Sequence, residues 1–477
     1  MKRNLILILL TVIYSNLLAQ HSDTLVYSLN ARLNPGVGTN APFLSTANQY
    51  DRHSFTTNSQ SFWGTIGKNI LSQRTFDYGF GVELNTTLSP TETRFFPGEL
   101  YIEGKVGPFL ANLGMKRDYL GNQDPELSSG NILSSQNSRP IPALTLETNG
   151  YVAVPFTKGY MEFMGGMANG WFSDKTETKN TLLHHKWLFL RLGGSLPLTV
   201  NYGINHVAQW AGTSQNFGSS PVSFDNFMRI FFAKNGSSSA PATEFYNILG
   251  NHIVSQQIGF SLKLHDWSAD FYWQDISETG PIYAFYETAF KKDGLWGLSL
   301  RMPKFKPMYA LAVEFLSTTN QGGPWHDLDG IVYGGTNNYF NNSVYTNGWS
   351  FYGMTIGNPW LTSPKYNTDG AVSIENNSLR MLYFSALGEI SQTKYRLTTA
   401  YSVNYGIPDK LYDLPKKQFS GQLEAFHELP FLRNAEASLG VSGDLGSQYG
   451  NNLALLIGFR YTGLFILNKH GQTNRPK

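Results

Sequence analysis

Aromatic and amide side chains gather in parts of the sequence that lack a regular secondary-structure pattern. Sugar rings stack their C–H faces on aromatic rings, and planar amides or carboxylates hold pairs of hydroxyls through directed hydrogen bonds. Both kinds of group therefore predict a carbohydrate-binding surface. The candidates are Gln209, Trp210, Trp325, His326, Asp327, Asn337, Asn338, Tyr339, Trp349 and Trp360. The alternative for each is packing of one loop against another, because burial is the commoner use of loop aromatics.

The densest part of this set is Asn337 to Pro359, within an interval from about Thr319 to Asn377 that shows no strand alternation. A connection of that length without its own secondary structure is usually functional or disordered. Its six aromatic rings between Tyr339 and Tyr352 would be costly to leave in water. We therefore expect an ordered loop that folds onto the rest of the chain.

No motif in the sequence predicts metal binding or catalysis. Asp327-Leu328-Asp329-Gly330 resembles the start of a calcium loop, but no Glu follows at the required distance. A nucleophile elbow, a zinc-protease helix motif and a phosphate loop are all missing from the sequence. We predict a non-catalytic protein without cofactor or metal, and a barrel enzyme is the weaker alternative.

Composition limits the class of protein. The chain has 477 residues, of which 41% are hydrophobic and 15% charged, against a usual charged share of about a quarter. A formal net charge of +2 gives no reason to expect nucleic acid as a partner. Because cysteine is absent, disulfides, Cys-ligated zinc and thiol catalysis are excluded. No stretch resembles a linker, so we expect one large body.

The N-terminus has the pattern of a secretory signal peptide. Met1-Lys2-Arg3 is basic, Leu5 to Leu18 is apolar, and Ala19-Gln20 is a plausible cleavage site. The apolar run is short for a membrane-spanning helix, which needs about 20 residues. We predict a signal peptide at residues 1–19 and a secreted protein or an outer-membrane barrel.

From Tyr78 onward the hydrophobic period is two, which indicates strands. Sixteen candidate strands have roughly the length that crosses a bilayer at a tilt. They are Tyr78–Leu88, Glu99–Val106, Phe109–Lys116, Thr145–Val154, Tyr160–Ala168, His185–Gly193, Leu198–Val207, Ile253–Leu264, Trp267–Ile276, Leu295–Met302, Met308–Thr318, Ser378–Ile390, Tyr395–Asn404, Gln418–Glu428, Ala435–Leu445 and Asn452–Phe465.

The connections between these strands alternate between short and long along the whole series. Gly107-Pro108 and His265-Asp266 are among the short ones, whereas Arg117 to Leu144 and Ala208 to His252 are among the long ones. An antiparallel outer-membrane barrel with short periplasmic turns and long outer loops has this arrangement. We predict such a barrel at residues 76–466, with a tail at 467–477. A soluble all-β protein is the alternative.

Two further expectations concern the interior of this barrel. We interpret His185, Arg191, His206 and His252 as polar groups that face the lumen. Residues 20–75 show little alternation, and Ser61 to Leu71 is the one stretch there that we interpret as a short helix.

A series of blocks resembles the Wzi-type capsule assembly proteins, in the branch found in Bacteroidetes. The blocks cover nearly the whole mature chain. They are Pro42-Phe43 with Ala47 to Tyr50, Arg139 to Pro142, Leu182 to Arg191, His206 to Trp210, Leu249 to His252, Lys292 to Gly297 and, most specific, Asn338 to Pro359.

The resemblance implies a barrel of eighteen antiparallel strands in the outer membrane of a Gram-negative cell. It also implies that residues 20–75 form a periplasmic plug. The two missing strands are then expected within Thr319 to Asn377 or Ala208 to His252. The implied function is lectin-like binding of capsular or other surface polysaccharide. The implied partners are that polysaccharide, outer-membrane lipid and, as a candidate, the capsule export machinery. A porin or substrate channel is the main alternative.

Overall fold

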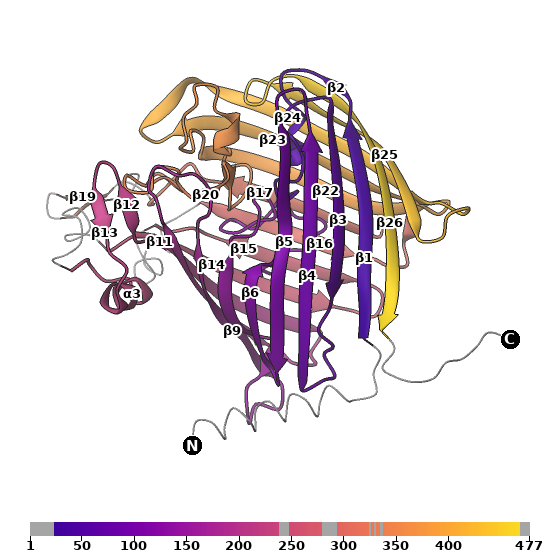
Figure 1. The fold of residues 1–477 in the computed structure, drawn as a ribbon, viewed down its shortest axis with the longest axis horizontal. Helices are drawn as coiled ribbons and strands as arrows, with labels where there is room; N and C mark the ends of the chain where they lie inside the picture. Colours follow the sequence, from indigo (N-terminus) through magenta and orange to yellow (C-terminus); the bar gives the residue numbers. More distant parts are fainter. Residues whose placement is uncertain are drawn as a thin grey trace.

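The computed structural model describes residues 23–237, 248–278, 293–323, 326–328, 331–333 and 337–467. These residues fold into a closed antiparallel β-barrel (Figure 1). Its sheet holds 20 strands, of which β2 and β8 are two-residue pieces, so that 18 strands form the wall. Strand β1 (Asp23–Asn34) pairs with both β3 (Ser59–Lys68) and the last strand, β26 (Asn452–Leu467), and these two pairings close the barrel.

The remaining wall strands follow in chain order, each antiparallel to its neighbours. They are β4 (Phe76–Leu88), β5 (Thr93–Val106), β6 (Phe109–Met115), β7 (Ala143–Thr148), β9 (Met161–Trp171), β10 (Leu182–Leu192), β11 (Leu198–Trp210), β14 (Asn251–Lys263), β15 (Ser268–Gln274), β16 (Gly294–Arg301), β17 (Ala310–Ser317), β22 (Ser378–Ile390), β23 (Thr393–Ile407), β24 (Lys410–Glu428) and β25 (Ala435–Gly446). Each of the sixteen strands predicted by alternation has its counterpart among these fifteen strands and β26.

Short elements occupy the connections. The strands are β2 (Gly36–Val37), β8 (Val152–Ala153), β12 (Gly212–Ser214), β13 (Gly218–Ser220), β18 (His326–Leu328), β19 (Ile331–Tyr333), β20 (Ser350–Phe351) and β21 (Met354–Thr355). The helices are α2 (Phe43–Thr46), α3 (Phe224–Phe231), η1 (Lys306–Met308) and η2 (Pro364–Tyr366). None of the described helices is both long and apolar enough to cross a membrane.

The two strands that alternation missed are β1 and β3, so the hairpin was expected in the wrong place. The predicted helix at Ser61 to Leu71 is also wrong, because most of that stretch is β3. Phe62 and Ile66 are exposed on the outer face of the strand, whereas Ser61 is buried on the inner face. Gly64 and Gly67 would each cost a helix interior about 1 kcal/mol.

The predicted boundary between plug and barrel at residue 75 is also wrong, because the barrel wall already begins with β1. Residues 35–58 connect the upper ends of β1 and β3, and they lie at the end of the barrel that carries the long loops. The described part of 20–75 therefore does not form a periplasmic plug. The predicted signal peptide at 1–19 and all of the predicted tail except Leu467 lie outside the described residues.

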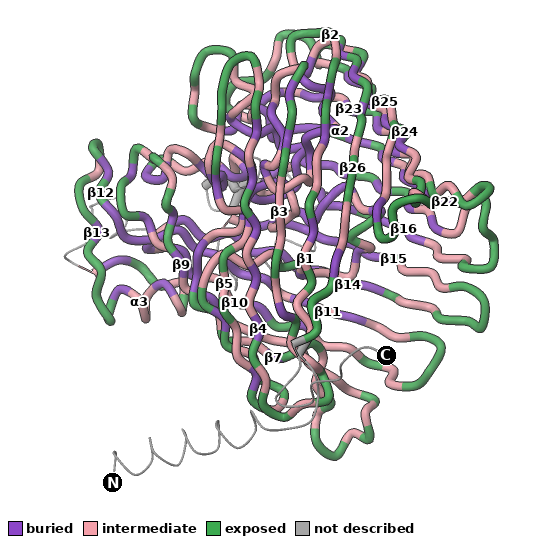
Figure 2. Tube along the Cα trace, turned by 45° about the vertical axis from the view of Figure 1, so that its right-hand side comes forward, coloured by how far each residue is buried: buried purple, intermediate pink, exposed green. Residues whose placement is uncertain are grey.

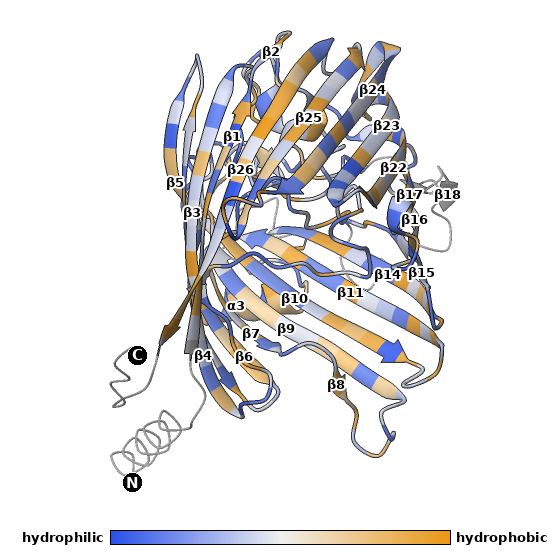
Figure 3. Ribbon diagram, turned by 90° about the vertical axis from the view of Figure 1, so that its right-hand side faces the viewer, coloured by the Kyte–Doolittle hydropathy of each residue, from blue (hydrophilic) through white to orange (hydrophobic). Residues whose placement is uncertain are grey.

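The two faces of the wall follow the alternation of the sequence (Figure 3). In β26, Leu455, Ile457 and Phe459 are exposed on the outer face, and Ala454 and Leu456 are buried on the inner face. An outward apolar band of this kind is the lipid-facing surface of an outer-membrane barrel.

The longest connections also lie together at one end of the barrel. Turns such as Ser391-Gln392 between β22 and β23 form the short-turn end, where residues are largely exposed (Figure 2). The long connections meet at the opposite end and bury much of their own length. The prediction that the long loops share one end is confirmed for the described connections, except that the predicted long loop Tyr405 to Lys417 is a two-residue turn between β23 and β24.

Candidate functional site

The long-loop end of the barrel is closed by three segments, 35–58, 116–142 and the described part of 318–377, which we call the cap. Trp349 is 2% exposed, and its Nε1 donates to the carbonyl oxygen of Leu133 at 2.8 Å. Phe43 stacks on Tyr449 with ring centroids 4.4 Å apart, and it contacts Trp360, which is 1% exposed, at 4.5 Å. The prediction of an ordered loop that folds onto the rest of the chain is confirmed.

Lumen-facing residues of the wall supply the surface on which the cap packs. Near the long-loop end these residues are apolar: Leu183 of β10, Val207 of β11, Ile253 of β14, Leu295 of β16 and Leu316 of β17. They join the cap aromatics in a single buried cluster. Burial of this apolar area stabilises the cap by roughly 25 cal/mol per Å² removed from water.

A buried carboxylate fixes the second cap segment to the wall. Glu314 of β17 accepts hydrogen bonds from Ser128 Oγ at 2.7 Å and from the backbone nitrogen of Ser129 at 2.8 Å. Tyr272 of β15 donates its hydroxyl to the same carboxylate. Gly297 makes this possible, because a Cβ there would lie 2.1 Å from the Tyr272 ring. An unpaired carboxylate would be costly in this position, and these donors satisfy it.

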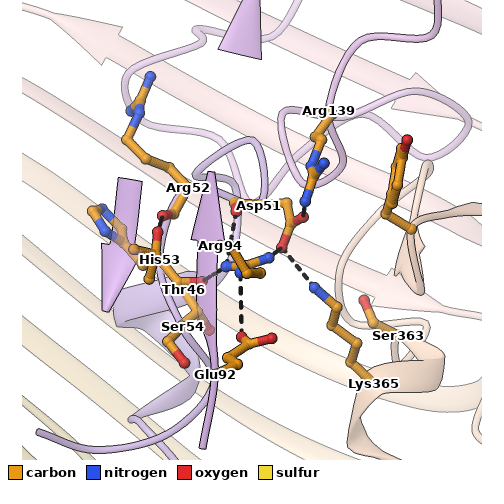
Figure 4. Close-up of polar contacts among 12 residues, drawn as sticks. Thr46, Asp51, Arg52, His53, Ser54, Glu92, Arg94, Arg139, Ser363 and Lys365 are labelled. Atoms are coloured by element: carbon orange, nitrogen blue, oxygen red, sulfur yellow. Dashed lines mark hydrogen bonds and ion pairs between the residues drawn. The ribbon is translucent and has the colours of Figure 1, made fainter. Parts of the chain in front are cut away.

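A second buried carboxylate joins all three cap segments (Figure 4). Asp51 lies in segment 35–58, and its Oδ1 is 2.7 Å from Arg94 Nη1 of β5 and 2.8 Å from Lys365 Nζ. Its Oδ2 is 2.7 Å from Arg139 Nη2 of segment 116–142. Because Lys365 belongs to segment 318–377, one side chain holds the three segments and the wall together.

The backbone around Asp51 is strained. The positive charges around the Asp51 side chain stabilise its ionised carboxylate. Asn48, Tyr50 and Asp51 have φ values of 55°, 55° and 54°, in the left-handed region that disfavours residues other than glycine. Burial alone would raise the Asp51 pKa, but Lys365 and the neighbouring arginines lower it below its ordinary value. The carboxylate is therefore charged at neutral pH.

A neighbouring cluster extends this network toward the lumen. Glu83 of β4 accepts from Arg52 Nη2 at 2.9 Å and from Arg117 Nη1 at 2.7 Å. Arg52 also stacks over the ring of Trp63, 4.7 Å from its centroid. The cap is thus held both by apolar packing and by buried ion pairs whose partners come from different segments.

Beneath Trp349 a cavity of about 130 Å³ remains between cap and wall. A water needs about 10–15 Å³ of such space, so the cavity holds on the order of ten water-sized groups. Its lining includes His185, Trp187 and Glu147. Trp187 Nε1 is buried there without a hydrogen-bond partner among the described residues. The structure thus brings two predicted site residues, Trp349 and His185, to one cavity.

Most described carbohydrate-binding candidates are enclosed. Gln209 donates to the carbonyl oxygen of Gly348 at 3.1 Å, and Tyr339, Trp349 and Trp360 are buried in the cap cluster. In this structure these four side chains pack and position the cap, which was the alternative for each of them. The identity of the residues that contact a glycan stays a prediction.

The other candidates differ in placement. Asn337 and Asn338 are half-buried, and Asn338 Nδ2 donates to Asp409 Oδ2 at 3.2 Å. Trp325 lies outside the described residues. His326 and Asp327 belong to the backbone of β18, and their side chains are not described.

The histidine prediction is half wrong. His185 and Arg191 face the lumen side of β10, where His185 Nε2 lies 2.6 Å from Asn205 Oδ1 and Arg191 pairs with Glu162. His206 and His252 face outward instead, with 2.8 Å between Nε2 of the first and Nδ1 of the second. His206 opposes Lys186 in the strand register, on the same face as Leu188, which is exposed to the outside.

Helix α3 explains how these outward histidines are buried. The helix lies against the outer face of β10 and β11, at the left in Figure 1, and Phe231 contacts the ring of His184. Ile230 packs with Ala208 and Trp210 on that face. Trp210 is also one of the carbohydrate-binding candidates from the sequence. Its side chain therefore lies on the outer face of the barrel wall, whereas the side chain of its neighbour Gln209 lies on the inner face.

Sequence reasoning missed the ion-pair network altogether. Asp51 and Lys365 are 314 positions apart, and no local pattern joins them. One usable signal existed for Glu83 and Glu314, which are charged residues at lumen-facing positions of alternating strands. Among the described residues, no group of three or more His, Asp or Glu side chains is placed to hold a metal ion.

Comparison with known proteins identifies the family. The model of the capsule assembly protein Wzi family matches residues 98–364, more than half of the chain. The chain belongs to the Wzi family of capsule assembly proteins. Among curated protein sequences, none matches it significantly.

Solved structures resemble this Wzi-family chain in fold. One is Wzi of Escherichia coli, described as a carbohydrate-binding β-barrel involved in group 1 capsule assembly. It has 12% identity and a TM-score of 0.56, with 94% of this chain and 87% of that chain covered. Pseudomonas aeruginosa OccK3 (OpdO) has 11% identity and a TM-score of 0.49, covering 95% and 99%. OccK5 (OpdH) of the same organism has 10% identity and a TM-score of 0.47, covering 94% and 99%. The protein is an outer-membrane β-barrel.

Proposed function

We propose that this protein holds surface polysaccharide at the long-loop end of its barrel and thereby assists capsule assembly, without catalysing a reaction. Membership of the Wzi family supports this role, and the Escherichia coli protein of similar fold is described as carbohydrate-binding. Long loops of such barrels face the outside of the cell, so the cap is the part that a surface polymer meets.

The single observation that carries the proposal is the closed cap. A substrate channel needs a continuous open lumen with a selective constriction. Here Trp349, Trp360 and Phe43 lie in a buried cluster with inward-facing wall residues, and Asp51 fixes the three cap segments together. A polymer on the outer side of the cap is therefore held at the surface. The porin alternative has less support.

Weak contacts suffice for this role. A capsular polymer presents the same unit many times, so several weak contacts to one chain add through effective concentration. Asn337 and Asn338 are candidates for such a contact, because both are only half-buried in the cap. The capsule export machinery is a further candidate partner at the membrane.

Deletion of the gene, followed by staining of cell-attached and released polysaccharide, tests the proposal. We expect cell-attached polymer to fall and released polymer to rise, with recovery when the gene is restored. Unchanged attachment would show that the protein does not anchor polymer. Planar-bilayer recordings test the channel alternative, since steady large conductance from the purified protein would contradict a closed cap.

A further inference from the structure

A chain of cavities continues through the lumen below the cap. The middle one, which we call the chamber, has a volume of about 410 Å³ and is lined mainly by residues of β1, β3 and β23 to β26. It shares Arg396 and Gln422 with a cavity of about 330 Å³ that reaches Phe43 of the cap. It shares Glu436 and Arg460 with a cavity of about 1010 Å³ at the short-turn end. The cap therefore closes the chamber at the long-loop end. At the other end the chamber borders the cavity at the short-turn end.

The charge of the chamber is positive. Its lining contains five arginines and three glutamates, an excess of two positive charges. They are Arg32, Arg52, Arg117, Arg396 and Arg460, with Glu83, Glu424 and Glu436. Arg52 and Arg117 both bind Glu83. Arg32 Nη2 lies 3.9 Å from Glu424 Oε2, and Arg396 opposes Glu424 in the strand register.

Three buried polar atoms of this lining have no hydrogen-bond partner among the described residues. Two are donors of charged groups, Arg32 Nη2 and Arg396 Nε. The third is an acceptor, Gln422 Oε1. Buried polar groups of native proteins are nearly always hydrogen-bonded, and a group left without a partner is costly. An anionic oxygen satisfies a guanidinium donor strongly, and a hydroxyl satisfies the amide acceptor, so a ligand that carries both fits these three atoms.

Aromatic side chains complete the lining. Trp63 of β3 and Phe426 of β24 both border the chamber. Sugar C–H faces pack well on such rings, whereas a bare inorganic anion gains nothing from them. We propose that the chamber binds a carboxylate-bearing saccharide of the hexuronate class, which enters from the short-turn end. This inference rests on the proposed polysaccharide function and adds a second, internal site for the same kind of polymer.

The test uses the full-length protein in detergent micelles and isothermal titration with a hexamer of galacturonic acid. We expect saturable binding that weakens as salt increases, with little binding of maltohexaose, a neutral hexamer. Hydrogen bonds to charged groups are strong, so Arg396→Gln should weaken binding by about tenfold or more. Arg229→Gln, at a half-buried position of α3 outside the barrel, is the matched control and should leave the affinity unchanged.

A second variant guards against a folding defect at Arg396. Gln422→Leu removes the unpaired acceptor without changing charge, and it should also weaken the hexuronate. Heat-modifiable migration on gels shows that each variant is folded. A loss of affinity in either folded variant supports the inference, and unchanged affinity in both overturns it. Equal affinity for maltohexaose or for inorganic phosphate also overturns it, because neither combines a carboxylate with sugar hydroxyls.

The two proposals fail in different ways. If deletion of the gene releases polymer from cells but the purified protein does not bind hexuronate, only the chamber inference is wrong. If the chamber binds hexuronate but the deletion strain keeps its polymer, the anchoring function is wrong.

Discussion

The most informative perturbation is Asp51→Asn, which removes one buried negative charge and leaves the shape of the side chain. Asp51 contacts Arg94, Arg139 and Lys365, whose side chains are only 13%, 8% and 25% exposed. At an effective dielectric constant of 20, one such pair contributes about 4 kcal/mol of Coulomb attraction. Recovery of the desolvation cost of the carboxylate offsets part of the loss.

The net loss should be about 3–5 kcal/mol, as for other buried pairs from which one partner is removed. That loss also removes the support of the strained backbone at Tyr50 and Asp51. Three cations would then repel one another beneath the cap. The hydrogen bonds between the wall strands are unaffected by the substitution. We therefore expect the cap to open while the wall stays folded. The open fraction should rise by roughly a hundredfold to a few thousandfold.

Two measurements report on the cap separately from the wall. Limited proteolysis of the protein in lipid vesicles should cleave the cap segments faster in the variant. Planar-bilayer recordings should show openings that the unchanged protein lacks. Because the Asp51 pKa is lowered, its stabilisation is present above the ordinary Asp pKa of 3.8 and is lost as pH falls through the lower folded value. The difference between the two proteins should therefore be constant from pH 5 to 8.

The matched control is Asp225→Asn on α3. Asp225 also pairs with an arginine at 2.7 Å, but its side chain is 65% exposed, so the ion pair contributes little. Proteolysis and conductance should stay unchanged in this control. If Asp51→Asn behaves like Asp225→Asn, the buried charge does not hold the cap, and the reasoning from the ion-pair network is refuted.

Three further predictions concern packing, pH and the lipid face. Trp349→Ala should destabilise the cap by about 3–5 kcal/mol, seen as faster proteolysis, whereas Trp171→Ala on the exposed outer face should not. Burial and then the charges of neighbouring arginines lower the pKa of His53 well below 6.5, so it contributes stability above pH 6.5 that is lost as pH falls toward the folded value. His53→Asn should therefore flatten the acid side of the stability profile, and an unchanged profile would contradict this. Leu298→Arg on the outer face of β16 should lower the unfolding free energy in vesicles by about 2–4 kcal/mol if it lies near the bilayer midplane, and Leu298→Met should have little effect.

The wall could be predicted from the sequence because strand alternation is a local signal. A lipid-facing side chain must be apolar, and its neighbours must face a polar or packed lumen, so each strand carries its own pattern. Strands β1 and β3 were missed although Leu29 and Leu33 of β1 alternate with Asn30 and Arg32. Their place close to the predicted signal peptide, and the plug implied by the family resemblance, favoured another interpretation.

The contacts of the cap could not be predicted in the same way. Aromatic composition indicated an ordered loop, but whether Trp349 faces a sugar or a protein core depends on segments more than 200 residues away, such as Leu133. The orientation of His206 depends in turn on α3, which covers an outer surface that alternation alone assigns to lipid. Tertiary contacts of this kind leave no periodic trace in the sequence.

Helix α3 has a consequence for the way the barrel sits in its bilayer. Under the helix, His184, Lys186 and His206 occupy outward positions that elsewhere carry apolar side chains. We therefore expect hydrocarbon to reach β10 only up to about Leu188, so that the apolar band is shorter on this side of the barrel. Such hydrophobic mismatch is relieved by tilt of the barrel or by local thinning of the outer leaflet. The protein would then sit asymmetrically in its membrane, with the α3 side at the thinned edge.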